Sequence, residues 1–170
     1  PQMIPKTVDY YLQRTSNGST LSEVVNSWVL ARSDRARSWT LFTKALQSDF
    51  ADVQGGTTPE GIHLGAMAGT VDLVQRCYMG IETRQEVLWL NPRLPDELAR
   101  LRLRLRYRQA SLCLDASHEV LKVRVVHCPA GPVRIGFGDR VMDLAEAEEV
   151  DLNLVVPKAP RPLPESPVRE

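Results

Sequence analysis

Residues 101–108 read LRLRLRYR, and this stretch decides the class of the fold. Leucine or tyrosine alternates with arginine at a period of two, which is typical of a β-strand with one buried and one solvated face. Turn formers such as Pro129-Ala130-Gly131-Pro132 separate further apolar runs downstream. These runs cover residues 111–114, 120–126, 133–137, 140–144 and 150–155. Six or seven short strands at such intervals predict an antiparallel sheet or a small sandwich.

Before about residue 80 the apolar residues recur at helical spacing instead. From Leu21 to Trp28 they follow the i, i+3, i+4, i+7 pattern, which predicts an amphipathic helix over residues 20–33. Three further helices are expected, over residues 7–13, 36–46 and 59–79. The last is apolar almost all round and contains Gly65 and Gly69. Because glycine in a helix interior costs about 1 kcal/mol relative to alanine, we expect close neighbours there and burial on most sides.

The composition excludes some classes of partner. The chain has 170 residues, and its 21 Lys plus Arg balance its 21 Asp plus Glu. Such a chain has no overall field to attract nucleic acid or an anionic membrane. It also has no apolar run near the roughly 20 residues that span a bilayer. We therefore expect no nucleic-acid partner, no membrane partner and a cytoplasmic location.

The arginines of residues 100–108 leave a nucleic-acid interface open as an alternative. The interleaved leucines belong in a core, however, and no aromatic stacking platform accompanies the arginines. We favour a solvated strand face with inter-strand Arg–carboxylate pairs, which also protects a strand against edge pairing.

The cysteines and histidines show no metal-ligand spacing. They are Cys77, Cys113, Cys128, His63, His118 and His127. We expect three idle thiols and no metal site.

Two loop-to-helix junctions are rich in hydroxyl groups and glycine. Thr20 and Glu23 have the spacing of a capping box, and Thr58 with Pro59 is an ordinary helix start. Capping alone explains either stretch taken singly. A helix N-terminus also favours an anion, because it presents free backbone N–H groups and a partial positive charge. If the two junctions converge, they form a small oxyanion pocket without a lysine or a metal.

The residues at these junctions resemble glycoside hydrolase family 65, which includes trehalose, maltose and kojibiose phosphorylases. The resemblance lies in RTSNGSTLS at residues 14–22 and DVQGGTTPEGIHLGAMAGT at residues 52–70. WLNPRLP at residues 89–95, followed by the Leu/Arg strand, matches the opening of that family's C-terminal β-domain. The match covers residues 8–110 well and the later strands loosely. Asn17 departs from the pattern, since family members often have histidine there.

The resemblance implies an α+β architecture in three parts. Residues 1–83 are expected to be the C-terminal helices of an (α/α)6 catalytic barrel, which is incomplete here. Residues 84–156 are the expected C-terminal β-domain, and residues 157–170 a disordered proline-rich tail. These helices cannot close a barrel by themselves, so we expect some of their apolar faces to be exposed. The chain is expected to be a piece of a longer protein.

The resemblance also implies the chemistry. In the family's phosphorylases a glutamic acid protonates the glycosidic oxygen while inorganic phosphate attacks the anomeric carbon from the opposite face, with inversion. The phosphate ligands, carried over, are Ser19, Thr20 and His63. The expected supporting loop is Gly55, Gly56, Thr57 and Thr58. The general-acid region has no counterpart, so we expect no catalytic residue in this chain, no activity from it alone, and no cofactor besides phosphate as co-substrate.

The expected partners are an α-linked glucose disaccharide and phosphate in the intact enzyme, together with the remainder of the catalytic barrel; a homodimer stays open. Two alternatives to a phosphorylase remain. One is a trehalase-like hydrolase of the same family, and the other is a non-catalytic helical-plus-β interaction module.

Overall fold

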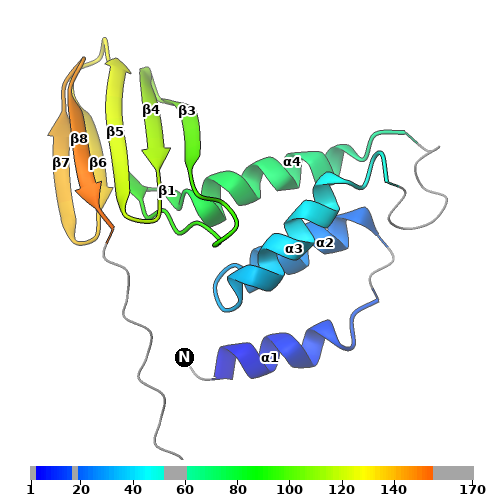
Figure 1. Ribbon diagram of the computed structural model, residues 1–170. Helices are drawn as coiled ribbons and strands as arrows, with labels where there is room; N and C mark the ends of the chain where they lie inside the picture. Colours follow the sequence, from blue (N-terminus) through cyan, green and yellow to red (C-terminus); the bar gives the residue numbers. More distant parts are fainter. Residues whose placement is uncertain (1–2, 17–18, 52–60, 155–170) are drawn as a thin grey trace, which may run out of the picture.

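The computed structural model describes residues 3–16, 19–51 and 61–154, which form a group of helices followed by a β-sandwich (Figure 1). The helices are α1 (Met3–Leu12), α2 (Thr20–Leu30), α3 (Arg35–Leu46) and α4 (Leu64–Asp72). A π-helical segment, η2 (Leu73–Tyr78), continues α4 without a break and leads into the sandwich. The predicted order of helices and then strands, and with it the α+β class, is confirmed.

Several predicted helix limits are corrected. The first helix begins at Met3 rather than Thr7. The second ends at Leu30, three residues before the predicted end. The predicted start of the fourth helix, Thr58 and Pro59, lies outside the described residues, but residues 61–63 are not helical and α4 begins at Leu64.

Helix α2 packs with a mixed face inward, on which Val24 and Leu30 are buried beside polar residues. Glu23 and Ser27 are buried, whereas Val25 and Trp28 are 51% and 37% exposed. The inward serine forms reciprocal hydrogen bonds with α3, because its Oγ donates to the carbonyl of Ser38 at 2.7 Å and the Ser38 Oγ donates back at 2.8 Å. The apolar stripe that predicted this helix therefore lies largely on the surface of the described structure.

Helix α4 shows the same feature. Leu64 is 74% exposed and Val71 is 57% exposed, while Ala66 and Thr70 are buried. The prediction that this helix is buried on most sides is wrong for the described structure. Its small residues pack against α2 on one face, and its larger apolar residues face outward. The predicted exposure of apolar helix faces is confirmed.

The sandwich contains two four-stranded sheets (Figure 1). One has the order β1-β2-β6-β7 and the other β3-β4-β5-β8. The strands are β1 (Ile81–Arg84), β2 (Val87–Leu90), β3 (Leu101–Tyr107), β4 (Ala110–Ala116), β5 (Val120–His127), β6 (Val133–Phe137), β7 (Arg140–Leu144) and β8 (Glu149–Asn153). The sequence did not predict β1 and β2. Strand β1 lies across the division expected between residues 83 and 84.

One pairing departs from the predicted antiparallel arrangement. Strand β2 pairs with β6 in parallel, with Leu88 opposite Ile135, whereas the other described pairings are antiparallel. After β2 the chain therefore forms β3, β4 and β5 of the second sheet and then returns to the first sheet as β6. Gly136 lies under Trp89 at this return, and a Cβ there would lie 2.4 Å from the indole ring.

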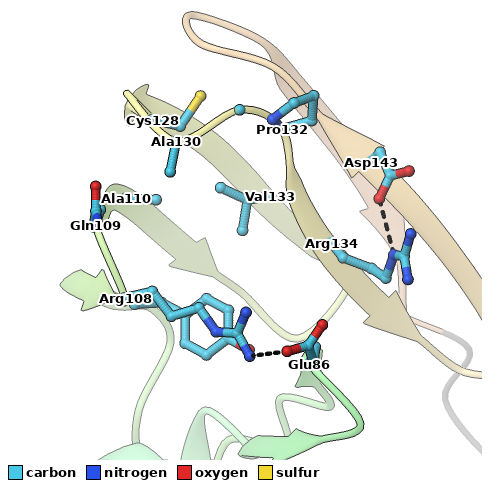
Figure 2. Close-up of a pocket in the computed structure, with 12 residues that line it drawn as sticks. Glu86, Arg108, Gln109, Ala110, Cys128, Ala130, Pro132, Val133, Arg134 and Asp143 are labelled. Atoms are coloured by element: carbon cyan, nitrogen blue, oxygen red, sulfur yellow. Dashed lines mark hydrogen bonds and ion pairs between the residues drawn. The ribbon is translucent and has the colours of Figure 1, made fainter.

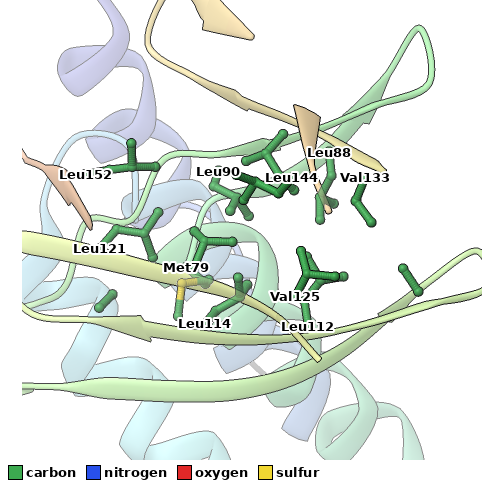
Figure 3. Close-up of a cluster of buried hydrophobic side chains, with 14 of the residues drawn as sticks. Met79, Leu88, Leu90, Leu112, Leu114, Leu121, Val125, Val133, Leu144 and Leu152 are labelled. Atoms are coloured by element: carbon green, nitrogen blue, oxygen red, sulfur yellow. The ribbon is translucent and has the colours of Figure 1, made fainter. Parts of the chain in front are cut away.

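The core fills the space between the two sheets (Figure 3). Leu112 and Leu114 of β4 and Leu121 of β5 point into it and are essentially fully buried. The leucines of β3 are partly buried and pack against the same cluster. The alternation of LRLRLRYR therefore corresponds to an inner and an outer face, as predicted.

The outer face of β3 carries the arginines. Arg100 donates two hydrogen bonds of 2.6 Å to Asp115 on β4, and Arg102 donates one of 2.8 Å. These contacts confirm the predicted inter-strand Arg–carboxylate pairs. Strand β3 is an edge strand, so the charges also lie where they oppose pairing with another chain.

The helices and the sandwich meet at the end of η2. Arg35 at the start of α3 donates hydrogen bonds to the carbonyls of Cys77 (3.1 Å) and Arg93 (2.6 Å). The backbone N–H of Arg93 donates to the carbonyl of Tyr78 at 2.8 Å. The guanidinium thus ties α3, η2 and the segment after β2 together.

Candidate functional site

Helices α2 and α4 pack closely and in parallel. Gly69 faces Val24 so tightly that a Cβ on the glycine would lie 2.4 Å from the valine Cγ1. Nearer the N-terminal ends, a Cβ on Gly65 would lie 4.0 Å from the Cδ1 of Leu21. Since both contacts advance in the same direction along the two helices, the helices run parallel. Their N-terminal ends lie together, at the end away from the sandwich (Figure 1).

Ser19 is the N-cap of α2, and its Oγ accepts a hydrogen bond of 3.2 Å from the backbone N–H of Leu21. The predicted cap was Thr20, which is instead the first helical residue and is buried. Glu23, the other half of the predicted capping box, forms an ion pair with Lys44 on α3. Of the two predicted hydroxyl ligands, Ser19 is therefore the exposed one.

His63 is the N-cap of α4, with no side-chain hydrogen bond to its own helix. It lies two residues before Gly65, as Ser19 lies two residues before Leu21. The close contact of those two partners therefore brings Ser19 and His63 to the same end of the helix pair. The second junction is described only from residue 61 onward, so the expected convergence of the two junctions stays a prediction.

Asp49, which the sequence analysis missed, contacts His63. Its Oδ1 accepts a hydrogen bond of 2.9 Å from the backbone N–H of His63 and lies 2.6 Å from the ring Nδ1. The two N–H···O contacts, first the backbone one and then that of the ring, hold the pKa of the Asp49 carboxyl below its usual value. No sequence signal marks this residue, because it lies just after α3 and meets His63 only through the tertiary fold.

This arrangement can bind an anion. Both helix dipoles present their positive ends here. Of the first N–H groups, that of Leu21 donates to the Ser19 Oγ, that of Ser22 to the Ser19 carbonyl and that of Leu64 to the Ile62 carbonyl. A serine hydroxyl adds one directional donor, and the imidazole, whose Nδ1 contacts Asp49, adds a second when Nε2 also carries a proton. The expected supporting residues Gly55, Gly56, Thr57 and Thr58 lie outside the described residues.

Other features of the described structure lie away from this place. A cavity of about 390 Å³ opens in the sandwich and is lined by the ion pairs Glu86–Arg108 and Arg134–Asp143 (Figure 2). None of the predicted site residues lines it. Among the described residues no group of His, Cys, Asp or Glu side chains could hold a metal ion. The three cysteines are free thiols. None of the described helices is long and apolar enough to cross a membrane.

Comparison with known proteins decides the family. Residues 1–72 match the model of the glycosyl hydrolase family 65 central catalytic domain, and residues 81–144 match that of the family's C-terminal domain. The chain belongs to glycosyl hydrolase family 65.

Relatives in family 65 are much longer than this chain. An uncharacterized glycosyl hydrolase of Mycobacterium tuberculosis (strain H37Rv) is 50% identical over 135 residues, which are 79% of this chain and 10% of that protein. Trehalose 6-phosphate phosphorylase of Lactococcus lactis is 35% identical over 101 residues, or 59% of this chain and 13% of the enzyme. The chain thus spans only about a tenth of the length of these family 65 relatives.

A solved family 65 structure has the same fold over most of the chain. It is assigned as a kojibiose phosphorylase from the human microbiome and superposes with a TM-score of 0.72 at 17% identity. The superposition covers 86% of this chain and 19% of the other. At this identity the likeness concerns the fold.

Proposed function

We propose that this chain supplies the phosphate-binding half of the active site of an inverting α-glucoside phosphorylase. The general acid and most sugar contacts come from the remainder of the catalytic domain in a longer protein. The observation that carries the proposal is that Ser19 and His63 are the N-cap residues of α2 and α4, which pack side by side. Relatives named as phosphorylases of trehalose 6-phosphate, nigerose and trehalose support the reaction class.

The proposed reaction moves one glycosyl group. A phosphate oxygen forms a bond to the anomeric carbon, while the bond from that carbon to the glycosidic oxygen breaks. The leaving oxygen takes its proton from the general acid, and the product is a sugar 1-phosphate of inverted configuration. The residues of this chain act on the phosphate: the Ser19 hydroxyl donates to its oxygens, the positive ends of the two helix dipoles attract it, and His63 holds it in line.

Asp49 bears on the choice between phosphorolysis and hydrolysis. An inverting hydrolase needs a carboxylate that removes a proton from water. Asp49 is the carboxylate beside His63, but its Oδ1 already accepts two hydrogen bonds from that residue. These bonds lower the pKa of Asp49 and therefore its basicity. This favours phosphate over activated water as the nucleophile.

The exposed apolar stripes of α2 and α4 support the proposed remainder of the domain. Valine, leucine and tryptophan side chains gathered on helix faces normally pack against another element. The family 65 model that these helices match is that of a catalytic domain, and the relatives continue far beyond the matched segment. We therefore assign the further helices of that domain as the element that covers these stripes.

The test of the reaction uses the full-length protein and α-linked glucose disaccharides, with and without inorganic phosphate. We expect cleavage to require phosphate and to yield one sugar 1-phosphate for each free sugar. Cleavage at the same rate without phosphate, with free sugars only, would establish the hydrolase instead. No cleavage by a folded full-length protein would favour the non-catalytic module.

The test of the site uses two pairs of variants. His63→Ala should abolish most phosphorolysis, whereas His118→Ala, in an exposed turn of the sandwich, should leave it unchanged. Ser19→Ala and Asp34→Ala each remove an N-cap, since Asp34 caps α3 by accepting from the N–H of Arg37 at 3.0 Å. Both should lose about 0.5–2 kcal/mol of stability, but only Ser19→Ala should raise the KM for phosphate. Equal effects of the two would assign Ser19 a capping role alone.

A further inference from the structure

The contact between Asp49 and His63 is more specific than a surface ion pair. One carboxylate oxygen receives both the backbone N–H and the ring Nδ1 of the same residue, at 2.9 and 2.6 Å. Each side chain keeps less than a fifth of its surface exposed, 19% for Asp49 and 18% for His63. Two bonds from one residue to one oxygen fix the position of the backbone and the rotation of the ring together.

The chemistry of the acceptor decides where the ring carries its proton. An ionised carboxylate is only an acceptor, so Nδ1 must be the donor in this contact. The ring therefore turns its other nitrogen, Nε2, away from Asp49. If Nε2 is protonated as well, it donates to an anion, and the ionised Asp49 supplies the countercharge to the imidazolium.

We infer that Asp49 is the positioning residue for His63, holding the ring with Nδ1–H on the carboxylate so that Nε2 is presented to the phosphate. This inference rests on the proposed function, because it assigns Asp49 a part in the same site. Asp49 acts through His63 and makes no contact with substrate in this role. It connects the end of α3 to the start of α4, so all three helices that meet at the site contribute to it.

Two substitutions separate orientation from charge. Asp49→Asn keeps an oxygen that can accept both bonds but removes the negative charge, whereas Asp49→Ala removes the acceptor. In the full-length protein we expect Asp49→Ala to raise the KM for phosphate about tenfold or more, as loss of a charge-assisted hydrogen bond does. The KM for the disaccharide should change little, and Asp49→Asn should lie between Asp49→Ala and the unchanged protein. Asp72→Asn, which removes a carboxylate paired with Arg76 at the C-terminal end of α4, is the matched control and should leave both constants unchanged.

A second readout follows the ring directly and requires no activity. In the ¹⁵N spectrum of the His63 imidazole in this chain, we expect Nδ1–H in the unchanged protein. Asp49→Ala should give a mixture of the two tautomers. If Asp49→Ala leaves both the tautomer and the KM for phosphate unchanged, the inference is wrong. A fall in apparent kcat in proportion to a loss of folded protein, with both KM values unchanged, would show a structural role instead.

The two readouts also separate this inference from the proposed function. If the full-length protein shows no phosphate dependence, the proposed function fails whatever Asp49 does. If phosphorolysis is present but Asp49→Ala has a normal KM for phosphate and the Nδ1–H tautomer, the proposed function stands and the role of Asp49 is refuted.

Discussion

Tyr78 and Met79 are neighbours in the chain and both are fully buried, yet they belong to different hydrophobic cores. Tyr78 packs with Phe42 and Trp39 among the helices, and its hydroxyl lies 3.3 Å from the Oγ of Ser38. Met79 packs with Leu88 and the other side chains between the two sheets. One peptide bond therefore connects the two cores.

This connection predicts that the two parts unfold together. Met79→Ala should lower the free energy of unfolding by about 2–5 kcal/mol, as for other buried large-to-alanine changes. In hydrogen exchange, we expect the protected amides of α2 and α3 to lose protection along with those of the sheets. Val126→Ala, at an exposed position of β5, is the control. Unchanged exchange in α2 and α3 would show two independently unfolding parts.

The two glycines of α4 should respond in opposite ways to alanine. Gly65→Ala meets only ordinary contact, at 4.0 Å, so it should gain up to about 1 kcal/mol from helix propensity. Gly69→Ala places a methyl group 2.4 Å from the stiff side chain of Val24 and should cost about 1–3 kcal/mol. Urea unfolding measures both. Adding Val24→Ala should reduce the cost of Gly69→Ala, whereas strict additivity of the two changes would contradict direct contact.

Valine-to-serine substitutions should distinguish the outer stripes from the helical core. Val25→Ser and Val71→Ser, at positions 51% and 57% exposed, should change the stability of this chain by about 0.5 kcal/mol or less. Val24→Ser, at a buried position, should cost about 2 kcal/mol. In the full-length protein we expect the two outer substitutions to be destabilising as well. A large cost at Val25 in the isolated chain, together with a dimeric mass in solution, would mean that a second copy covers the stripe.

The Arg100–Asp115 pair predicts a dependence of stability on acid. The side-chain hydrogen bond from Arg100, more than that from Arg102, holds the pKa of Asp115 below its usual value. A carboxyl with a depressed folded pKa contributes stability above its unfolded pKa and loses it as the pH falls through the folded value. We expect the gap in urea midpoint between the unchanged protein and Asp115→Asn to be constant above about pH 5 and to shrink below about pH 4. Asp139→Asn, in the exposed β6–β7 turn, should show no such change in the gap. A gap that persists at pH 2 would contradict the prediction.

The sequence predicted those parts of the fold whose local pattern agrees with their tertiary surroundings. The alternation at residues 101–108 marks the inner and outer faces of β3 correctly, and Gly69 marks a close helix contact. Helix α2 is the opposite case. Its apolar periodicity identified the helix, but Leu21, Val25 and Trp28 are exposed in the described structure, and Val24 is the member of the stripe that is buried. Periodicity shows which side of a helix is apolar, and the neighbouring elements decide whether that side is covered.

The sequence did not predict strands β1 and β2 because the turn between them contains none of the usual turn-forming residues. Gln85 and Glu86 both adopt positive φ, at 49° and 67°, in the tight connection between the two strands. Asn-Gly or Asp-Gly normally occupies such a turn, because those residues reach this conformation at low cost. Of the candidate site, the sequence predicted Ser19 and His63 through the family resemblance. It missed Asp49, since a contact across 14 residues of chain leaves no local pattern.

The parallel pairing of β2 with β6 sets the order in which the sandwich can assemble. A hairpin such as β1–β2 or β3–β4 can form as soon as its second strand leaves the ribosome, because its partners are adjacent in the chain. The pairing of Leu88 with Ile135 can instead form only after β3, β4 and β5 have been synthesised. Of the described strand pairings, this one joins the residues farthest apart in the chain, so its closure carries the largest loop-closure entropy. Until β6 is synthesised, one edge of β2 is unpaired and the Trp89 indole does not yet pack on Gly136. Nascent chains that stop before β6 should therefore be the ones that chaperones retain.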